Sequence, residues 1–168
     1  MKKQMLVDLF NSQAYIGHQR KYRTPQLQKY IYCRIHGIDI INLDFTIRQI
    51  ENAINFLEQN KEKKLLVVSR RQTQCFLDNC LVSKIEKFKP GYISNFNYGK
   101  LDFIPDIIVI DKVADNHNLI KEASKEGVTM IGFCDTNTPF SLFSKINYPI
   151  VINDDSDKAI QYLLSHLI

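Results

Sequence analysis

The sequence contains four apolar runs of strand length, and their pattern limits what the chain can fold into more than any other feature. Each run is apolar throughout instead of alternating with polar residues, which is typical of a parallel strand buried on both faces of its sheet. The runs are "KLLVVS" (64–69), "DIIVI" (106–110), "VTMIGFC" (128–134) and "PIVI" (149–152).

Helical patterns lie between and around these runs. Ile47, Ile50 and Ile54 recur on one helical face after Asp44, which we expect to cap that helix. Because strands alternate with helices, we predict a doubly wound α/β domain, in which helices cover both faces of a parallel sheet. The segments with a helical pattern are 1–11, 43–64, 71–85, 116–126 and a last one that begins near Asp157.

Shorter patterns indicate further strands. "YIYC" (30–33) and "IDIIN" (38–42) flank the turn "RIHG", and "YIS" (92–94) is an isolated candidate. Residues 12–29 show neither period, because Gly17 and Pro25 interrupt them. We expect residues 1–168 to form a single domain on which a basic N-terminal segment, residues 1–36, packs.

Composition argues against several classes of protein. Hydrophobic residues make up 45% of the chain and charged residues 24%, as in ordinary globular domains. No apolar run approaches the roughly 18 residues of a membrane helix, and Asp8 interrupts the start "MKKQMLVDLF", which argues against a secretory signal. The four cysteines form no C-x-x-C pair, so we expect free thiols in a reducing compartment and no metal site.

Acidic residues follow three of the apolar runs, at Asp111, at Asp135 and at the pair Asp154 and Asp155. The carboxyl ends of parallel strands meet at one edge of a sheet, so these residues are expected to form a rim. One hypothesis is a small α/β enzyme whose rim holds Mg²⁺ or supplies an acid and a base. The other is that "DTN" and "NDD" terminate strands and cap helices, which we favour because no nucleophile motif is present.

Motifs for nucleotide cofactors are missing. The sequence has neither G-x-G-x-x-G nor G-x-x-x-x-G-K-[ST]. Arg70 and Arg71 follow "KLLVVS" and could hold a phosphate at a helix N-terminus, or they could form an exposed turn. Both interpretations remain open, and we predict no cofactor.

Charge is distributed unevenly along the chain. Residues 1–100 contain 17 Lys and Arg against 8 Asp and Glu, whereas residues 101–168 contain 5 against 10. Such a basic half is either a solvated face or a binding surface for a polyanion. Tyrosines lie among these cations, which suits base stacking together with phosphate contact. His18, in "GHQRKYRTP", is a candidate general base, loop residue or RNA contact.

Several segments, in order, resemble the family of small-subunit ribosomal protein two. That family carries F-G-H-Q, N-P-K-M, K-P-[YF]-I-[FY], G-I-H-I-I-[DN]-L, L-P-D-x-[IL]-x-V-I-D, D-T-N and P-x-N-D-D. Each piece alone is weak, and the ordered combination, which runs from about residue 12 to the C-terminus, is specific. The corresponding segments here are Ile16–Gln19, Thr24–Leu27, Lys29–Tyr32, Gly37–Leu43, Ile104–Asp111, Asp135–Asn137 and Ile152–Asp155.

The chain also departs from the family pattern. The family carries N-x-R-W-x-G-G-x-L-T-N and then a long helical hairpin, whereas here "SNFNYGKLDF" leads directly into "IPDIIVID". In this alignment Phe96 replaces the Trp, Tyr98 and Gly99 occupy the two Gly positions, and Leu101 is kept. We therefore expect the hairpin, and every contact that it makes in relatives, to be missing.

The resemblance implies a flavodoxin-like or Rossmann-like domain without catalytic residues. Family members bind small-subunit rRNA and neighbouring ribosomal proteins between head and body, with mRNA nearby, and in bacteria they help dock the mRNA-binding protein one. On that analogy the acidic strand ends are rigid loops: Gly17, Asp111, Asp135, Thr136, Asn137, Asn153, Asp154 and Asp155. The expected rRNA contacts are His18, Arg20, Lys21, Arg23, Lys29 and Arg34, followed by Arg70, Arg71 and Lys100.

The source compartment is inferred from composition and length. The chain is rich in Ile, Asn, Lys, Phe and Tyr, which AT-rich codons favour, and it shows no presequence before the family core. We therefore expect an organelle-encoded protein of a mitochondrial ribosome, while a plastid or a reduced bacterium fits the same facts. A free-standing RNA-binding module is a further alternative, and it would bind RNA well without a partly assembled ribosomal particle.

Overall fold

The computed structural model describes residues 2–69, 82–85, 88–94 and 104–168. Several predictions concern residues outside these ranges. They are the helix expected for 71–81, the rRNA contacts Arg70, Arg71 and Lys100, and the segment 96–101 that replaces the family's Trp-Gly-Gly phrase.

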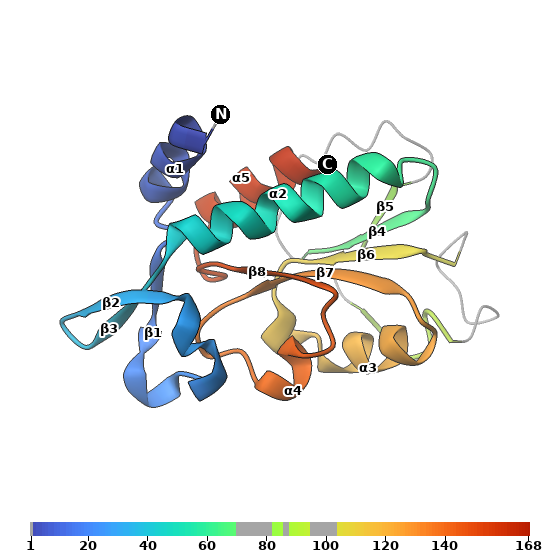
Figure 1. Cartoon of the computed structure of the whole chain (residues 1–168). Coiled ribbons are helices and arrows are strands. Elements are labelled where there is room, and N and C mark those ends of the chain that lie inside the picture. Colours follow the sequence, from blue (N-terminus) through green and yellow to red (C-terminus); the bar gives the residue numbers. More distant parts are fainter. Residues whose placement is uncertain (1, 70–81, 86–87, 95–103) are drawn as a thin grey trace.

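A parallel sheet of five strands forms the centre of the molecule (Figure 1). Its order is β5-β4-β6-β7-β8, which corresponds to 2-1-3-4-5 in chain order, the flavodoxin-like arrangement. The predicted α/β fold class is thereby confirmed, and all four apolar runs form strands. The strands are β4 (Leu65–Val68), β5 (Val82–Ile85), β6 (Ile107–Ile110), β7 (Thr129–Cys134) and β8 (Tyr148–Val151).

Helices cover the sheet on both faces, which explains why β4, β6, β7 and β8 are rich in apolar residues. Side chains alternate across a strand, so Leu65 and Val67 of β4 enter one core cluster whereas Leu66 and Val68 enter the other. The first cluster lies under α1 (Lys2–Asn11), α2 (Leu43–Gln59) and α5 (Asp157–Leu167), and the second lies under η4 (Val113–Asp115), α3 (His117–Lys125) and α4 (Phe140–Phe143) (Figure 1).

A second, antiparallel sheet of three strands lies beside the carboxyl ends of the parallel sheet (Figure 1). Its strands are β1 (Ile16–Gln19), β2 (Ile31–Ile35) and β3 (Ile38–Ile41), in the order β1-β3-β2. The β2–β3 hairpin turns through His36 and Gly37, which have φ angles of 48° and 82°. Two 3₁₀ helices, η1 (Arg20–Tyr22) and η2 (Pro25–Tyr30), connect β1 to β2.

Three local predictions were wrong. Residues 82–85 form strand β5 and not the end of a helix, because parallel pairing with β4 overrides the helical spacing of Val82 and Ile85. The expected strand 92–94 is a turn, in which the Glu122 carboxylate accepts hydrogen bonds from the backbone N–H groups of Ile93 and Ser94 at 3.2 and 2.7 Å. The N-cap of α2 is Asn42, which accepts from the N–H of Asp44 at 3.0 Å.

Two further observations concern the thiols and the helices. Cys33 and Cys134 are free thiols, and Cys134 is fully buried, as predicted for a small hydrophobic residue. Among the helices in the described part of the chain, none combines the length and the apolar character that crossing a membrane requires.

Candidate nucleic-acid interface

Strand β1 and the segment after it are fastened to the loops that follow β7 and β8. The backbone N–H of His18 donates to Thr136 Oγ1 at 2.9 Å, and the N–H of Thr24 donates to the Thr136 carbonyl at 2.9 Å. On the other loop, Asn153 Nδ2 donates to the Gln13 carbonyl at 3.0 Å. The "DTN" and "NDD" segments therefore both form hydrogen bonds with the N-terminal segment.

Gly17 lies where β1 crosses the loop after β7. A Cβ atom built at this position would lie 2.7 Å from Thr136 Cγ2 and 2.9 Å from the Asp39 carbonyl oxygen. Any side chain would overlap one of these groups, so the close approach of β1 requires glycine.

The His18 imidazole lies between two of the rim carboxylates. Its Nδ1 lies 3.1 Å from Asp135 Oδ2, and its Nε2 lies 3.3 Å from Asp155 Oδ2. Hydrogen bonding to Asp135 raises the pKa of His18, burial opposes the shift, and the charges of Asp135, Asp155 and Asp154 add to the increase. A protonated ring suits this position, because each ring nitrogen lies within 3.3 Å of a carboxylate oxygen.

Lys112 completes the cluster of charges. Its Nζ lies 2.5 Å from Asp155 Oδ1 and 3.4 Å from Asp154 Oδ1. Burial raises the pKa of Asp154 to about 7, the charge of Asp135 adds to the increase, and Lys112 opposes it. Three of the four predicted rim aspartates thus come together with two cationic side chains.

The fourth rim residue, Asp111, stands apart from this cluster. It is 3% exposed and accepts a hydrogen bond from Ser69 Oγ at 2.8 Å, at the end of β4. In the loop after β7, Thr136 Oγ1 donates to Asp135 Oδ1 at 3.0 Å. Such contacts close strand ends, as expected for structural Asp and Asn residues.

The same cluster contains donor atoms that a divalent cation could use. One ligand atom each from His18, Asp135 and Asp155 lies within 4.8 Å of the others, the one such group found in the described ranges. A nitrogen with two carboxylate oxygens is a donor set of the kind that Zn²⁺ accepts. Binding would require neutral His18, so an ion would compete with protonation of the ring.

The predicted basic residues fall into two groups. Arg23 and Arg34 face the fully buried carboxylate of Asp39, with Arg34 Nε 3.1 Å from Oδ1 and Arg23 Nη1 3.4 Å from Oδ2. These two arginines hold η1 and β2 against β3. By contrast, Arg20, Lys21 and Lys29 are exposed on the two 3₁₀ helices.

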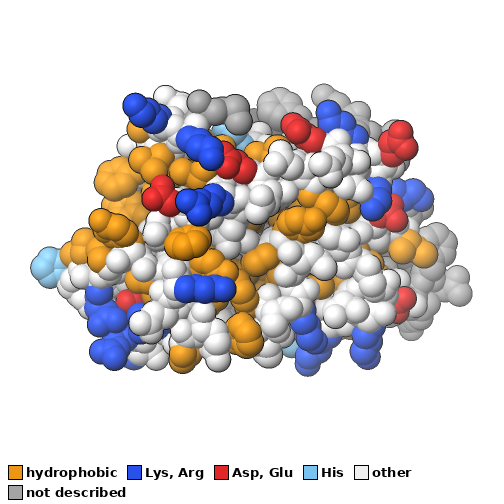
Figure 2. Space-filling view, viewed as in Figure 1, with side chains coloured by type: hydrophobic (Ala, Val, Ile, Leu, Met, Phe, Trp, Pro, Cys, Tyr) orange, Lys and Arg blue, Asp and Glu red, His pale blue; other side chains and the backbone are white. Residues whose placement is uncertain are grey.

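Aromatic rings lie beside the exposed lysines. Lys21 Nζ lies 4.7 Å from the centroid of the Tyr22 ring, and Lys29 Nζ lies 4.9 Å from that of Tyr30. Tyr22 is 57% exposed. In Figure 2, Lys and Arg side chains gather at the lower left, over the N-terminal sheet and its 3₁₀ helices. Cationic side chains with exposed rings are the surface chemistry expected of an RNA contact.

An apolar groove lies between α1 and β2. It has a volume of about 450 Å³, and its walls include Leu6, Phe10, Tyr32 and Ile35. Phe10 is 57% exposed, Tyr32 74% and Ile35 52%. Figure 2 shows apolar side chains gathered on this side of the molecule. An exposed apolar surface of this kind marks an interaction site.

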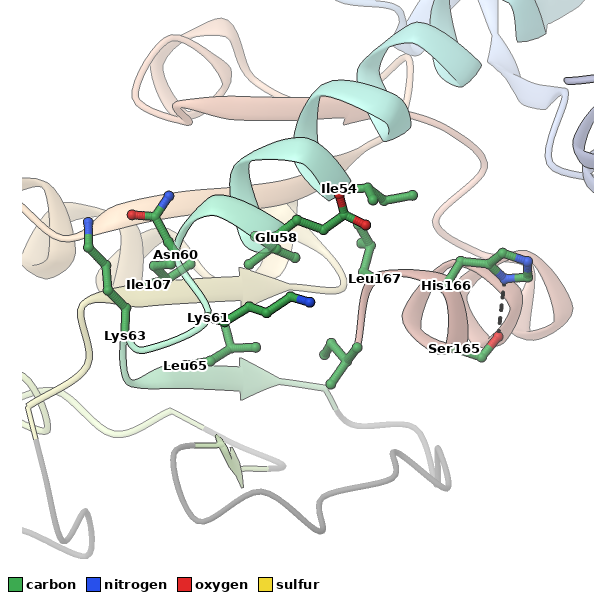
Figure 3. Close-up of a pocket in the computed structure, with 12 residues that line it drawn as sticks. Ile54, Glu58, Asn60, Lys61, Lys63, Leu65, Ile107, Ser165, His166 and Leu167 are labelled. Carbon is green, nitrogen blue, oxygen red and sulfur yellow. Dashed lines mark hydrogen bonds between the residues drawn. The ribbon is translucent and has the colours of Figure 1, made fainter. Parts of the chain in front are cut away.

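Another cavity, of about 370 Å³, lies at the opposite end of the sheet (Figure 3). Leu65 and Ile107, at the amino ends of β4 and β6, line it together with Leu167, and Lys61 and Lys63 lie around it. Open α/β sheets bind ligands at the carboxyl ends of their strands, so this cavity is not the expected ligand site.

Sequence reasoning missed three residues of the interface: Tyr22, Lys112 and Asp39. Tyr22 was one of several tyrosines in the basic segment, and no local pattern distinguished it. Asp39 is one of only two acidic residues in the first 39, the other being Asp8, and it lies among several arginines. That signal could have identified it as an ion-pair partner.

Comparisons with known proteins agree with this geometry. The family model "Ribosomal protein S2" matches residues 9–98 and 84–168. The chain belongs to the ribosomal protein S2 family. The family's motifs lie in the hydrogen-bonded segments described above, at Gly17 and His18 on β1 and at the two loops after β7 and β8.

Relatives come from bacteria and from an animal. The chain is 27% identical to "Small ribosomal subunit protein uS2" of Coprothermobacter proteolyticus, over 96% of this chain and 79% of that protein. It is 30% identical to "Small ribosomal subunit protein uS2m" of Bos taurus, over 91% of this chain and 56% of that protein. A third relative, from Francisella philomiragia, is 24% identical over 95% of this chain and 88% of its own length.

Relatives also carry residues that this chain lacks. The alignment with the Coprothermobacter protein spans 215 residues, although this chain has 168. The family model matches in two pieces that overlap at residues 84–98. The hairpin is predicted to be missing a few residues later, between Phe103 and Ile104.

Proposed function

We propose that this protein is a structural constituent of the small ribosomal subunit, where it binds small-subunit rRNA and neighbouring ribosomal proteins between head and body. Family membership supports this role in translation. The observation that carries the rRNA contact is the exposed strip of Arg20, Lys21 and Lys29, held on a segment that the strand-end loops fix in place.

The predicted rRNA contacts take different parts in this proposal. Arg20, Lys21 and Lys29 bind phosphates directly, and such contacts position a protein without reading base sequence. His18, Arg23 and Arg34 act mainly by holding the strip, since each is engaged with a carboxylate of the protein. Arg70, Arg71 and Lys100 remain proposed contacts on the basis of sequence alone.

The N-terminal segment is proposed to belong to the same domain as the parallel sheet, residues 1–168. Helix α1 packs on α2 and α5, and Lys2 forms an ion pair with Glu51 at 3.2 Å. Ser156, the N-cap of α5, donates from its Oγ to the Ser12 carbonyl at 2.7 Å. These contacts support a basic arm that is packed and not free.

A protein neighbour is proposed to cover the groove between α1 and β2. Its exposed rings and Ile35 present apolar surface that a partner would bury. The net acidic C-terminal part of the chain is proposed to face solvent or basic neighbouring proteins.

The mitochondrial ribosome is the proposed location. The Bos taurus relative, a mitochondrial form, is 30% identical, and the residue usage of this chain is that of an AT-rich organellar gene. Bacterial relatives of similar identity leave a plastid or a bacterial cytoplasm as the alternatives.

Sedimentation tests the proposed function. A lysate is separated on sucrose gradients at low and at high salt, and the protein is detected across the fractions. We expect comigration with the small subunit at low salt and weaker association at high salt, because phosphate contacts release counterions. Migration as free protein at both salt concentrations would contradict the proposal.

A further inference from the structure

A small cavity opens at the carboxyl edge of the parallel sheet, next to His18. Its volume is about 360 Å³. The cavity lies where open α/β sheets hold their ligands, beyond the ends of β7 and β8. Its lining comes from three parts of the chain: β1 (Ile16–Gln19), the pair Tyr22 and Ile38, and the loop residues Asn153 and Asp155.

The walls of this cavity differ in chemistry. The phenol ring of Tyr22 forms an aromatic wall, whereas Ile16, Gly17 and Ile38 provide an apolar surface. The Asp155 carboxylate, 55% exposed, provides a hydrogen-bond acceptor on the remaining side. A flat heterocycle with polar edges fits such a site better than a chain of methylene groups does.

Tyr22 is available for stacking. The ring is 57% exposed, and the ring contacts found among the described residues give it no aromatic partner. Lys21 Nζ lies 4.7 Å from its centroid, but Lys21 does not line the cavity. The ammonium group therefore leaves the cavity side of the ring open to a ligand.

The segment that carries Tyr22 is held on both sides. Before it, the N–H of Arg20 donates to the Gly37 carbonyl at 3.4 Å. After it, the N–H of Arg23 donates to the Arg20 carbonyl at 3.1 Å, and Thr24 Oγ1 donates to the Thr138 carbonyl at 2.7 Å. These bonds fix the backbone that carries Tyr22, so little backbone entropy is lost when a ligand stacks on the ring, which favours binding.

Positive charge lies next to the aromatic wall. Arg20 and Lys21 precede Tyr22 in η1, and both side chains are exposed. A ring that can stack one base, with two cations for the adjoining phosphates, is the arrangement with which proteins bind unpaired nucleotides. A base inside a helix cannot use it, because both of its faces are already stacked.

We propose that this cavity binds the base of a single unpaired nucleotide, stacked on Tyr22, with its phosphates at Arg20 and Lys21. The inference rests on the proposed function, since the nucleotide would be an unpaired residue of rRNA; a free nucleotide has the same chemistry. Asp155 selects no particular base, because its Oδ1 lies 2.5 Å from Lys112 Nζ and its Oδ2 lies 3.3 Å from His18 Nε2.

Fluorescence anisotropy of labelled RNA tests the proposal with the full chain. The probes are a fully paired RNA duplex and the same duplex with one unpaired guanosine. We expect the unpaired guanosine to increase affinity about tenfold, which corresponds to the stacking of one base. Tyr22→Ala should abolish the difference, whereas Tyr22→Phe, which keeps the ring, should retain it.

Tyr32→Ala is the matched control, because Tyr32 is more exposed than Tyr22 and does not line this cavity. It should retain the full preference for the unpaired guanosine. Equal affinity for the two duplexes, or an unchanged preference in Tyr22→Ala, would overturn the proposal.

Two further measurements complete the test. The first distinguishes rRNA from a free nucleotide as the ligand, and the second distinguishes a failure of the cavity proposal from a failure of the proposed function. Guanosine monophosphate that binds alone, and displaces the RNA at similar concentrations, would assign the cavity to a free nucleotide and not to rRNA. Sedimentation of Tyr22→Ala in a lysate tests the ribosomal role independently. If the wild-type protein shows no preference for the unpaired guanosine and still comigrates with the small subunit, the cavity inference fails and the proposed function stands.

Discussion

His18 Nδ1 lies 3.1 Å from Asp135 Oδ2 and joins strand β1 to the end of β7. Asp135 is fully buried, whereas the His18 side chain is 26% exposed. A buried carboxylate needs a partner that carries charge or donates hydrogen bonds, and here that partner comes from the basic N-terminal segment. One contact therefore both neutralises the rim and fixes the strand that leads into the proposed RNA-binding strip.

Asp135→Asn should destabilise the protein. The substitution keeps the shape of the side chain and removes the charge that faces His18, so a charge-assisted hydrogen bond becomes a neutral one. We expect the free energy of unfolding to fall by about 1.5–3 kcal/mol, the range for hydrogen bonds to charged groups. Urea denaturation gives this value.

Asp155→Asn is the control for that experiment. Asp155 also faces His18, at 3.3 Å, but its side chain is 55% exposed and water screens its charge. We expect a decrease below about 1 kcal/mol. Equal decreases in the two variants would contradict a special role for the buried contact.

The same contact predicts how stability depends on pH. The pKa of His18 is higher in the folded protein than its ordinary value of 6.5, so the folded state binds the proton more tightly. The contribution of His18 is therefore fully present below pH 6.5 and is lost as pH rises through the folded pKa. The pKa of about 7 for Asp154 acts with the same sign, because it too is raised.

Titration by NMR checks this prediction directly. The ring protons of His18 should titrate above pH 6.5, and the free energy of unfolding should decrease as pH rises above 6.5 and through the folded pKa. In Asp135→Asn the midpoint should move down, since the hydrogen bond that mainly raises the pKa of His18 is weakened. A His18 midpoint below its ordinary value in the wild-type protein would refute the ion pair.

The central fold was predictable because its signal is local. The four apolar runs form β4, β6, β7 and β8, since a strand buried on both faces has few polar residues to confuse the pattern. Strand β5 was missed because the spacing of its apolar residues is helical, whereas its conformation is set by pairing with β4. Strand β1 was missed because its position is fixed by contacts with distant loops, such as that of His18 with Thr136.

The site was predictable only in part, for the same physical reason. The rim aspartates could be placed at one edge because strand ends of a parallel sheet meet there. No local rule connects His18 with Asp135, or Arg23 and Arg34 with Asp39, since these pairs form only when the chain is folded. Sequence therefore predicted which groups carry charge, and the fold determined which of them are paired within the protein.

Gly17→Ala tests the close approach of β1 to the loop after β7. The new methyl group would meet Thr136 Cγ2 at 2.7 Å and the Asp39 carbonyl at 2.9 Å. We expect stability to fall by about 1–3 kcal/mol, as for overpacked positions. Thr136→Ser removes Cγ2, so adding it to Gly17→Ala should recover part of that decrease. Thermal unfolding of the single and double variants measures this, and no recovery would place the strain elsewhere.

Asp39→Ala tests whether Arg23 and Arg34 stabilise the fold through their shared carboxylate, unlike the exposed cations. It leaves Arg23 and Arg34 without the carboxylate that they share, and we expect stability to fall by about 3 kcal/mol, the lower end for breaking a buried pair. Asp44→Ala, in the first turn of α2 and outside this group of charges, should cost less than about 1 kcal/mol. Similar effects in the two variants, measured by urea denaturation, would argue against the paired arrangement.

Replacing Arg20, Lys21 and Lys29 by alanine should leave stability almost unchanged and weaken association with the small subunit. These exposed side chains contribute little to folding, so stability should change by less than about 0.5 kcal/mol for each one. Association with small subunits that lack the protein should weaken. The logarithmic salt dependence should become shallower by about 0.7–0.9 for each phosphate that the variant no longer neutralises.

Lys61→Ala with Lys63→Ala is the matched control for that triple variant. These lysines are also exposed, but they lie at the opposite end of the parallel sheet, around the cavity of Figure 3. Their removal should leave the salt dependence of subunit binding unchanged, because they are far from the proposed strip. If both variants lowered the salt dependence equally, the attraction would come from the net charge of the protein. A decrease confined to the triple variant would assign the phosphate contacts to the two 3₁₀ helices.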